Sequence, residues 1–279
     1  MHEHGEYHGE AAVAGGSGGA RVRAPRAGDA RPHRLDQRTY LDGGRCRVIL
    51  RPYGDGLAEV GWSFVPASLP IGAAKGKAED RAAHELRAIR RARSTVRQLI
   101  LAASLDHLLT LTYRANVTDY GRASADLSRY IRKVRRSFLG AHYVAVPEQQ
   151  QRGAWHWHLA VRGRQDVYLH RAAWLQVVGD GNIDVKAPVV GASRGPLALA
   201  RYLSKYLSKG FTAGNRRLNG HRFRASHGIA IPERAIEVPP DQRGNVRELA
   251  LKALADVAGA VGFIWESDDR TAGWACSWK

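Results

Sequence analysis

Residues 153–161 read GAWHWHLAV and place two histidines one residue apart inside an otherwise apolar run. Because alternate side chains of a β-strand point to the same face, His156 and His158 would project together while Trp157 points to the other side. Two imidazoles on one face can hold a metal ion. Core histidines that bond to backbone or water are more common, so further residues must decide between the two interpretations.

The sequence just before this stretch predicts the partner strand of a hairpin. Residues 141–163 contain two apolar runs that are separated by a polar segment with Arg152 and Gly153. Glu148 lies on the partner strand and can bring a carboxylate to the two histidines. Mixed histidine and carboxylate ligation suits Mg²⁺ or Mn²⁺ with positions left open for a phosphate, whereas a structural zinc site would want a fourth protein ligand. An ordinary surface glutamate is the alternative.

A second motif, PLALARYLSKYLSKGF at residues 196–211, begins with proline, repeats apolar residues at helical spacing and ends near a glycine. These features predict a helix. Tyr202 and Tyr206 are four residues apart and share one helical face, and each is followed three residues later by a lysine, Lys205 or Lys209. The arrangement offers phenolic nucleophiles with nearby cations. Packing of both tyrosines in the core is the alternative.

Composition indicates a folded protein that attracts polyanions. The chain has 279 residues, of which 44% are hydrophobic, and 43 Lys and Arg against 26 Asp and Glu give a net charge of +17. Such a field recruits nucleic acid, although an arginine-rich solvated surface is the alternative. Two distant cysteines, Cys46 and Cys276, fit no metal spacing. Without a signal peptide or an apolar run of about 18 residues, we expect a cytoplasmic protein and no membrane partner.

The remaining patterns divide the chain into four segments. Residues 1–40 are rich in Gly and Ala without periodicity and predict a flexible tail. Residues 41–104 predict a hairpin and a basic helix, and residues 231–279 predict a C-terminal extension that contains a helix. The histidine and tyrosine motifs lie between them, within residues 105–230, which we expect to form the catalytic core.

Three motifs together resemble the HUH endonucleases, and within them the rolling-circle replication initiator (Rep) proteins of plasmids and phages. LLTLTY at 108–113, HWH at 156–158 and YLSKYLSK at 202–209 occur in the order found in that family. Glu148 matches a carboxylate that supplies a third metal ligand in some of these proteins. The segment HRFRASHG at 221–228 is similar to the Arg-rich segment that follows the tyrosine helix in many relatives.

The resemblance implies a fold and a reaction. Together with the mixture of hairpins and helices it predicts an α+β fold, with one antiparallel sheet of about five strands, the histidine strand at its centre and helices packed over one face. A divalent metal, Mg or Mn, held by His156, His158 and Glu148 would polarise a scissile phosphate. Tyr202 or Tyr206 would then attack phosphorus, which leaves a 5′-phosphotyrosine and a free 3′-OH.

The paired tyrosines resemble the two-tyrosine subclass of Rep proteins. Relatives with a single tyrosine use one Tyr-x-x-Lys, and both copies in this chain satisfy that pattern, so either tyrosine can attack first. A free tyrosine has a pKa of about 10 and therefore needs help to act as a nucleophile. Lys205 or Lys209 would favour the phenolate or neutralise the phosphate.

Basic and aromatic side chains predict how DNA is held. The candidate phosphate contacts lie on two basic helices and in the segment after the tyrosine helix: Arg87, Arg90, Arg91, Arg129, Arg132, Lys133, Arg136, Arg222 and Arg224. Trp155 and Phe223 either stack on unpaired bases or pack in the core. The sequence contains no Gly-Lys-Ser/Thr loop for nucleotide binding, so we expect a host helicase to unwind the duplex and a host polymerase to extend the nicked end.

These features favour a site-specific, metal-dependent enzyme that nicks and joins single-stranded or origin DNA and starts rolling-circle replication. The enzymatic alternative is an HUH transposase or a relaxase with the same chemistry. Relaxases often carry a third histidine and place the tyrosine near the N-terminus, and this chain does neither. The other alternative is a basic DNA-binding protein that has no enzymatic activity and whose histidines are structural.

Overall fold

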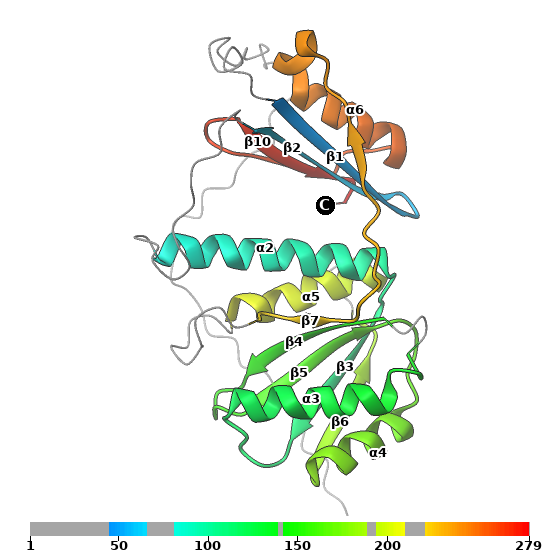
Figure 1. Cartoon of the computed structure of the whole chain (residues 1–279). Helices are drawn as coiled ribbons and strands as arrows, with labels where there is room; N and C mark the ends of the chain where they lie inside the picture. Colours follow the sequence, from blue (N-terminus) through cyan, green and yellow to red (C-terminus); the bar gives the residue numbers. More distant parts are fainter. Residues whose placement is uncertain (1–44, 66–80, 139–141, 189–193, 210–220, 279) are drawn as a thin grey trace, which may run out of the picture.

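The computed structural model describes residues 45–65, 81–138, 142–188, 194–209 and 221–278, so the predicted tail at 1–40 lies outside the described residues. The described chain forms two five-stranded antiparallel sheets and five α-helices (Figure 1). One, here named the central sheet, has the strand order β6-β3-β5-β4-β7, and the other, the flanking sheet, has the order β8-β1-β2-β10-β9. The predicted α+β class is confirmed, and the flanking sheet is an addition to it.

The central sheet is built around the histidine strand. Its strands are β3 (His107–Tyr113), β4 (Tyr143–Gln149), β5 (Trp155–Val161), β6 (Gly181–Lys186) and β7 (Arg224–Ala225). The middle strand is β5, as the sequence predicted, and all seven of its residues are buried. A strand buried on both faces reads as a nearly continuous apolar run, which is what the sequence of β5 shows.

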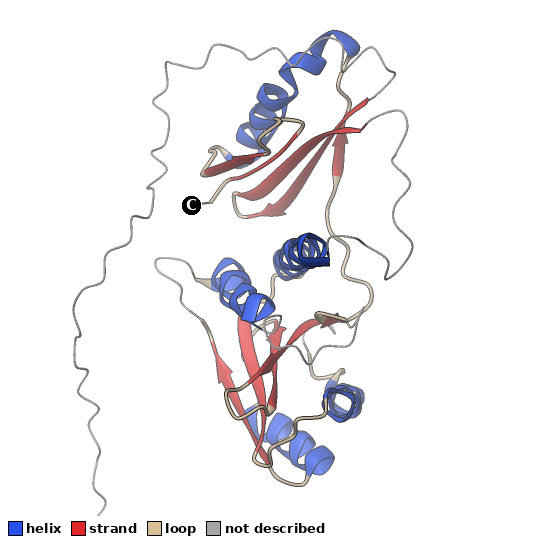
Figure 2. Ribbon diagram, turned by 90° about the vertical axis from the view of Figure 1, so that its left-hand side faces the viewer, coloured by secondary structure: helices blue, strands red, loops and turns tan. Residues whose placement is uncertain are grey.

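Helices cover both faces of the central sheet rather than one (Figures 1 and 2). On one face lie α3 (Tyr120–Val134) and α4 (Val167–Val178), and on the other lie α2 (Arg81–Ala102) and α5 (Gly195–Lys209). Trp157 packs toward α3, and its neighbour in sequence His158 faces α5. The expectation of one covered face was wrong because β5 has large or apolar side chains in both of its alternating sets. None of the described helices combines the length and the apolarity that crossing a bilayer requires.

The flanking sheet combines segments from both ends of the described chain. Its strands are β1 (Arg45–Gly54), β2 (Leu57–Val65), β8 (Arg234–Ile236), β9 (Phe263–Glu266) and β10 (Ala272–Cys276). The helix α6 (Val246–Ala258), which follows a 3-10 turn η2 (Pro240–Asn245), covers one face of this sheet. The predicted hairpin joins β1 to β2 through Gly54 and Gly56, and both glycines have positive φ angles. The domain boundaries proposed from the sequence stay a prediction.

A buried carboxylate joins the flanking sheet to α2. Glu59 of β2 is fully buried. Its Oε2 atom accepts hydrogen bonds from Arg97 Nη2 at 2.7 Å and from Trp274 Nε1 at 3.2 Å, and its Oε1 atom accepts from Gln98 Nε2 at 2.8 Å and from the Tyr53 hydroxyl at 2.9 Å. Because a buried charge is costly unless it is paired and hydrogen-bonded, this network holds the sheet against the helix.

Candidate active site

The hairpin of β4 and β5 brings Glu148 to the two histidines. In the register of this hairpin Glu148 lies directly opposite His156. The Oε2 atom of Glu148 is 2.7 Å from Nε2 of His158, and the two imidazole ring centroids are 6.4 Å apart. Trp157 points to the opposite face, where its Nε1 donates to the Ala123 carbonyl at 3.1 Å. The three side chains that the sequence analysis singled out as metal ligands are therefore neighbours.

Both tyrosines of α5 face this cluster. The ring of Tyr206 stacks on the imidazole of His158 with 4.1 Å between centroids, and the ring of Tyr202 lies edge-on to the same imidazole at 6.5 Å. The Tyr206 hydroxyl donates a hydrogen bond of 2.6 Å to the Tyr202 hydroxyl. Because residues four apart share a helical face, one helix can present two phenols to one strand. The histidine and tyrosine motifs thus form a single site.

The protonation of the site follows from its partial burial. Burial raises the pKa of Tyr206 above its usual value, and the hydrogen bond to Tyr202 and the charge of Glu148 raise it further. At neutral pH the Tyr206 phenol is therefore protonated unless a cation at the site favours the phenolate. Burial also lowers the pKa of His156, and the neighbouring His158 lowers it further. The imidazole of His156 is then neutral at pH 7, which is the form that binds a metal.

The donor set next to β5 fits a divalent cation in its chemistry. No three His, Cys, Asp or Glu side chains in the described part of the chain converge on one point as a finished metal centre. His156 Nε2, however, is buried and has no hydrogen-bond partner among the described residues, while His158 Nε2 contacts Glu148. A buried polar atom without a partner calls for an explanation, and two imidazoles with a carboxylate are ligands that Mn²⁺ accepts. The metal itself stays a prediction.

Two residues near the site were missed by the sequence analysis. Thr110 Oγ1 lies 3.2 Å from His158 Nδ1, so it can fix the ring orientation while Nε2 faces Glu148. Lys186 of β6 pairs with Asp184 at 2.7 Å, which raises the pKa of Lys186, and the charge of Tyr202 acts in the same direction. The signal for Lys186 was the alternation of polar and apolar residues in NIDVK, which places it on the same sheet face as Thr110.

The lysines predicted next to the tyrosines are less informative. Lys205 is exposed on α5, and the side chain of Lys209 lies outside the described residues. Neither is brought to a phenol by a described contact, and their roles stay predictions.

The predicted phosphate contacts divide between the two faces of the central sheet. Exposed side chains on α2, the face of the tyrosines, are Arg87, Arg90 and Arg91. Exposed side chains on α3, the opposite face, are Arg129, Arg132, Lys133 and Arg136. Arg222 pairs with Glu85 of α2 at 2.6 Å, and Arg224 donates to the Ser128 hydroxyl of α3 at 2.8 Å. A strand bound at the tyrosines therefore has the α2 arginines on its own face of the sheet.

The two aromatic residues proposed for base stacking are packing residues. Trp155 is 9% exposed, and its Nε1 donates to the Thr118 carbonyl at 2.9 Å. Phe223 is half-buried against the core under α2 and α5. For both residues the core-packing alternative agrees with the structure.

Comparison with known proteins supports the same part of the chain. Residues 106–211 match the family model of the replication-associated proteins of the ORF2 type. The matched segment begins next to β3 and ends just after α5, so it contains both histidines, Glu148 and both tyrosines, and it spans less than half of the chain. No curated protein and no solved structure matches. Over this segment the chain is similar to replication-associated proteins, a similarity that suggests DNA binding and a nuclease type of activity.

Proposed function

We propose that this protein is a site-specific, metal-dependent enzyme that nicks and joins single-stranded DNA and initiates rolling-circle replication through a 5′-phosphotyrosine. The observation that carries the proposal is the contact between the two motifs: the Tyr206 ring stacks on His158 at 4.1 Å, and the same imidazole is 2.7 Å from Glu148. The match to replication-associated proteins over residues 106–211 supports the biological role.

The reaction assigned to the tyrosines is a transesterification. The hydroxyl oxygen of Tyr202 or Tyr206 attacks the scissile phosphorus, a bond forms between that oxygen and phosphorus, and the bond from phosphorus to the 3′ oxygen breaks. The phenolic proton leaves the nucleophile, and the departing 3′ oxygen takes up a proton. The second tyrosine lies one hydrogen bond away, at 2.6 Å, so it can resolve the first linkage in the same way.

His156, His158 and Glu148 are the residues we propose as ligands of Mg²⁺ or Mn²⁺. When bound, the ion polarises the phosphate and offsets the charge that develops on its oxygens. Glu148 would exchange its hydrogen bond with His158 for the metal, and the unpartnered Nε2 of His156 would gain a partner. Thr110 would keep the His158 ring oriented during this exchange.

The family match favours replication over transposition or conjugation, because the matching model is described by replication alone. The proposed partners are origin DNA, a host helicase and a host polymerase. The remaining alternative is a basic DNA-binding protein without chemistry.

A denaturing gel separates the enzyme from the binding protein. The chain is incubated with Mn²⁺ and a labelled single-stranded oligonucleotide library that includes the DNA flanking its coding region. We expect a covalent protein–DNA product that survives denaturation and is lost in the Tyr202→Phe/Tyr206→Phe double variant. A complex that dissociates on denaturation in every case, or an adduct that persists in the double variant, would contradict the proposal. The exposed-tyrosine variant Tyr168→Ala on α4 is the matched control.

A further inference from the structure

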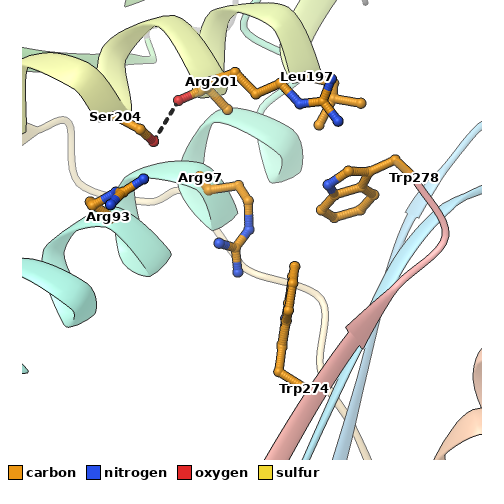
Figure 3. Close-up of a pocket in the computed structure, with 8 residues that line it drawn as sticks. Arg93, Arg97, Leu197, Arg201, Ser204, Trp274 and Trp278 are labelled. Carbon is orange, nitrogen blue, oxygen red and sulfur yellow. Dashed lines mark hydrogen bonds between the residues drawn. The ribbon is translucent and has the colours of Figure 1, made fainter. Parts of the chain in front are cut away.

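A pocket opens where α2 and α5 face the flanking sheet (Figure 3). Its volume is about 220 Å³. The eight residues that line it are Arg93 and Arg97 of α2, Leu197, Ala200, Arg201 and Ser204 of α5, Trp274 of β10, and Trp278. Arginine and tryptophan therefore make up most of the lining, and none of these eight residues is acidic.

The aromatic and basic side chains in the pocket are in contact. The Arg97 guanidinium lies 4.7 Å from the centroid of the Trp274 ring, and the rings of Trp274 and Trp278 are 6.2 Å apart. In Figure 3, Arg97 extends toward Trp274, and Arg201 extends from α5 toward Trp278. Glu59 offsets the charge of Arg97 from behind, so Arg93 at the edge of the pocket adds positive charge to the opening.

The aromatic surface continues beyond the pocket onto the edge strand β9. In the register of β9 and β10, Trp265 lies opposite Trp274 and Phe263 lies opposite Cys276. Residues that lie opposite each other in a sheet share a face, so Phe263 and Trp265 project on the side of Trp274, away from α6. Phe263 is 51% exposed and Trp265 is 50% exposed, and the Phe263 ring is 6.0 Å from that of Trp274.

We propose that this aromatic groove, made of Phe263, Trp265, Trp274, Trp278 and Arg93, binds unpaired nucleotides of single-stranded DNA. Aromatic rings stack on bases of any sequence, and arginines next to them contact the phosphates between the bases. A row of large exposed aromatic side chains marks an interaction surface rather than a solvated one. The net charge of +17 selects a polyanion as the partner.

The position of the groove connects it to the proposed nicking site, and in this respect the inference rests on the proposed function. Arg201 and Ser204 line the pocket, while their neighbours Tyr202 and Tyr206 face His158 across the same helix. An α-helix with its side chains is about 10 Å across. A strand that leaves the tyrosines can therefore reach the groove after about one helix diameter, and the groove would hold the DNA flanking the nick.

Equilibrium binding tests the groove without any chemistry. The full chain carrying Tyr202→Phe and Tyr206→Phe is titrated, in EDTA, against a fluorescein-labelled mixed-sequence single strand of about 20 nucleotides and followed by fluorescence anisotropy. We expect the added pair Phe263→Ala/Trp265→Ala to raise Kd at least about tenfold, because each lost stack weakens binding by about that factor. Tyr168→Ala, which removes an 82% exposed aromatic ring on α4, should leave Kd unchanged.

The arginine at the opening gives a second measurement. Arg93→Ala should weaken binding and lower the slope of log Kd against log salt by about one, because one phosphate contact is lost. Lys252→Ala on α6 removes one charge from an exposed site away from the groove and should change neither quantity. Arg93 is exposed on α2, so its variant should keep the fold.

Three results would overturn the groove: a Kd within twofold of the parent for Phe263→Ala/Trp265→Ala, equal weakening by Tyr168→Ala, or tighter binding of duplex than of single strands by the parent. The adduct assay with intact tyrosines reports on the nuclease separately. Absent adduct with groove-dependent binding rejects the nuclease and retains the groove. Adduct formation with groove-independent binding rejects the groove and retains the nuclease.

Discussion

The central and flanking sheets have five strands each but are covered differently. The central sheet has helices on both faces, and its middle strand β5 buries all seven of its residues. The flanking sheet has α6 on one face, and its edge strand β9 leaves Phe263, Ile264 and Trp265 exposed. The match to replication-associated proteins covers the central sheet from β3 to α5 and none of the flanking strands. We infer that the central sheet carries the chemistry and that the flanking sheet adds a contact for the substrate.

Metal removal should separate the two sheets most strongly. EDTA should lower the rate of adduct formation by about a thousandfold, because an ion at a reacting phosphate supplies several kcal/mol of charge stabilisation. Single-strand binding in the aromatic groove should not change. Gel quantification and anisotropy on the same samples measure both effects, and added Mn²⁺ should restore the adduct. Full adduct formation in EDTA would remove the metal from the account.

Glu59→Gln should show how the two sheets are joined. It leaves Arg97 without its buried carboxylate, and breaking a buried ion pair costs about 3 kcal/mol in the free energy of unfolding. Glu233→Gln is the matched control, because its pair with Arg51 is partly exposed and its loss costs less than about 1 kcal/mol. Urea denaturation measures both. Equal losses for the two variants would mean that the Glu59 network does not hold the flanking sheet in place.

Thr110→Val should weaken the central site without touching its ligands. The substitution removes the hydroxyl that lies 3.2 Å from His158 Nδ1 and keeps the shape of the side chain. Loss of a hydrogen bond that orients a metal-binding histidine lowers metal affinity by about tenfold. The Mn²⁺ concentration needed for half-maximal adduct formation should rise by that factor, whereas Thr110→Ser should restore it. An unchanged Mn²⁺ requirement for Thr110→Val would show that Thr110 serves packing alone.

The smallest expected effect is a pH dependence of stability on the face of the central sheet away from the tyrosines. Burial lowers the pKa of His170 below the value of about 6.5 that it has in the unfolded chain, and the charge of Asp166 offsets this only in part. Between the two pKa values the unfolded state binds a proton that the folded state does not. The free energy of unfolding should therefore fall as the pH drops below about 6.5.

His170→Gln should reduce this dependence, and urea denaturation at several pH values measures it. The pKa of His156 is lowered in the same direction, so part of the slope should remain in the variant. A slope that is identical with and without His170 would contradict the assignment.

The central sheet could be predicted because its signals are local. The alternation in WHWHLAV and the helical spacing in YLSKYLSK lie within single elements, and the hairpin that brings Glu148 to His156 is a short connection. The strand count and the central position of β5 followed. The roles of Thr110 and Lys186 did not, because each depends on the pairing of β3 with strands distant in sequence.

The flanking sheet left no comparable signal. Strand β2 pairs with β10 over more than 200 residues, with Ser63 opposite Ala272. The aromatic residues near the end of the chain are regularly spaced only once β9 and β10 are paired. Glu59 looks like any strand glutamate until Arg97 and Gln98 of α2 are placed above it. Pairing between such distant segments is decided by the packing of the whole chain, not by local pattern.

Peptide mapping of the covalent adduct tests the central claim most directly. After nuclease digestion of the DNA, trypsin should release the nucleotide on the peptide YLSK, which arises from both 202–205 and 206–209. Tyr202→Phe and Tyr206→Phe, analysed separately, then assign the linkage to one tyrosine or to both. Mass spectrometry should find the nucleotide on this peptide alone. A nucleotide attached to any other peptide would contradict a nucleophile on α5.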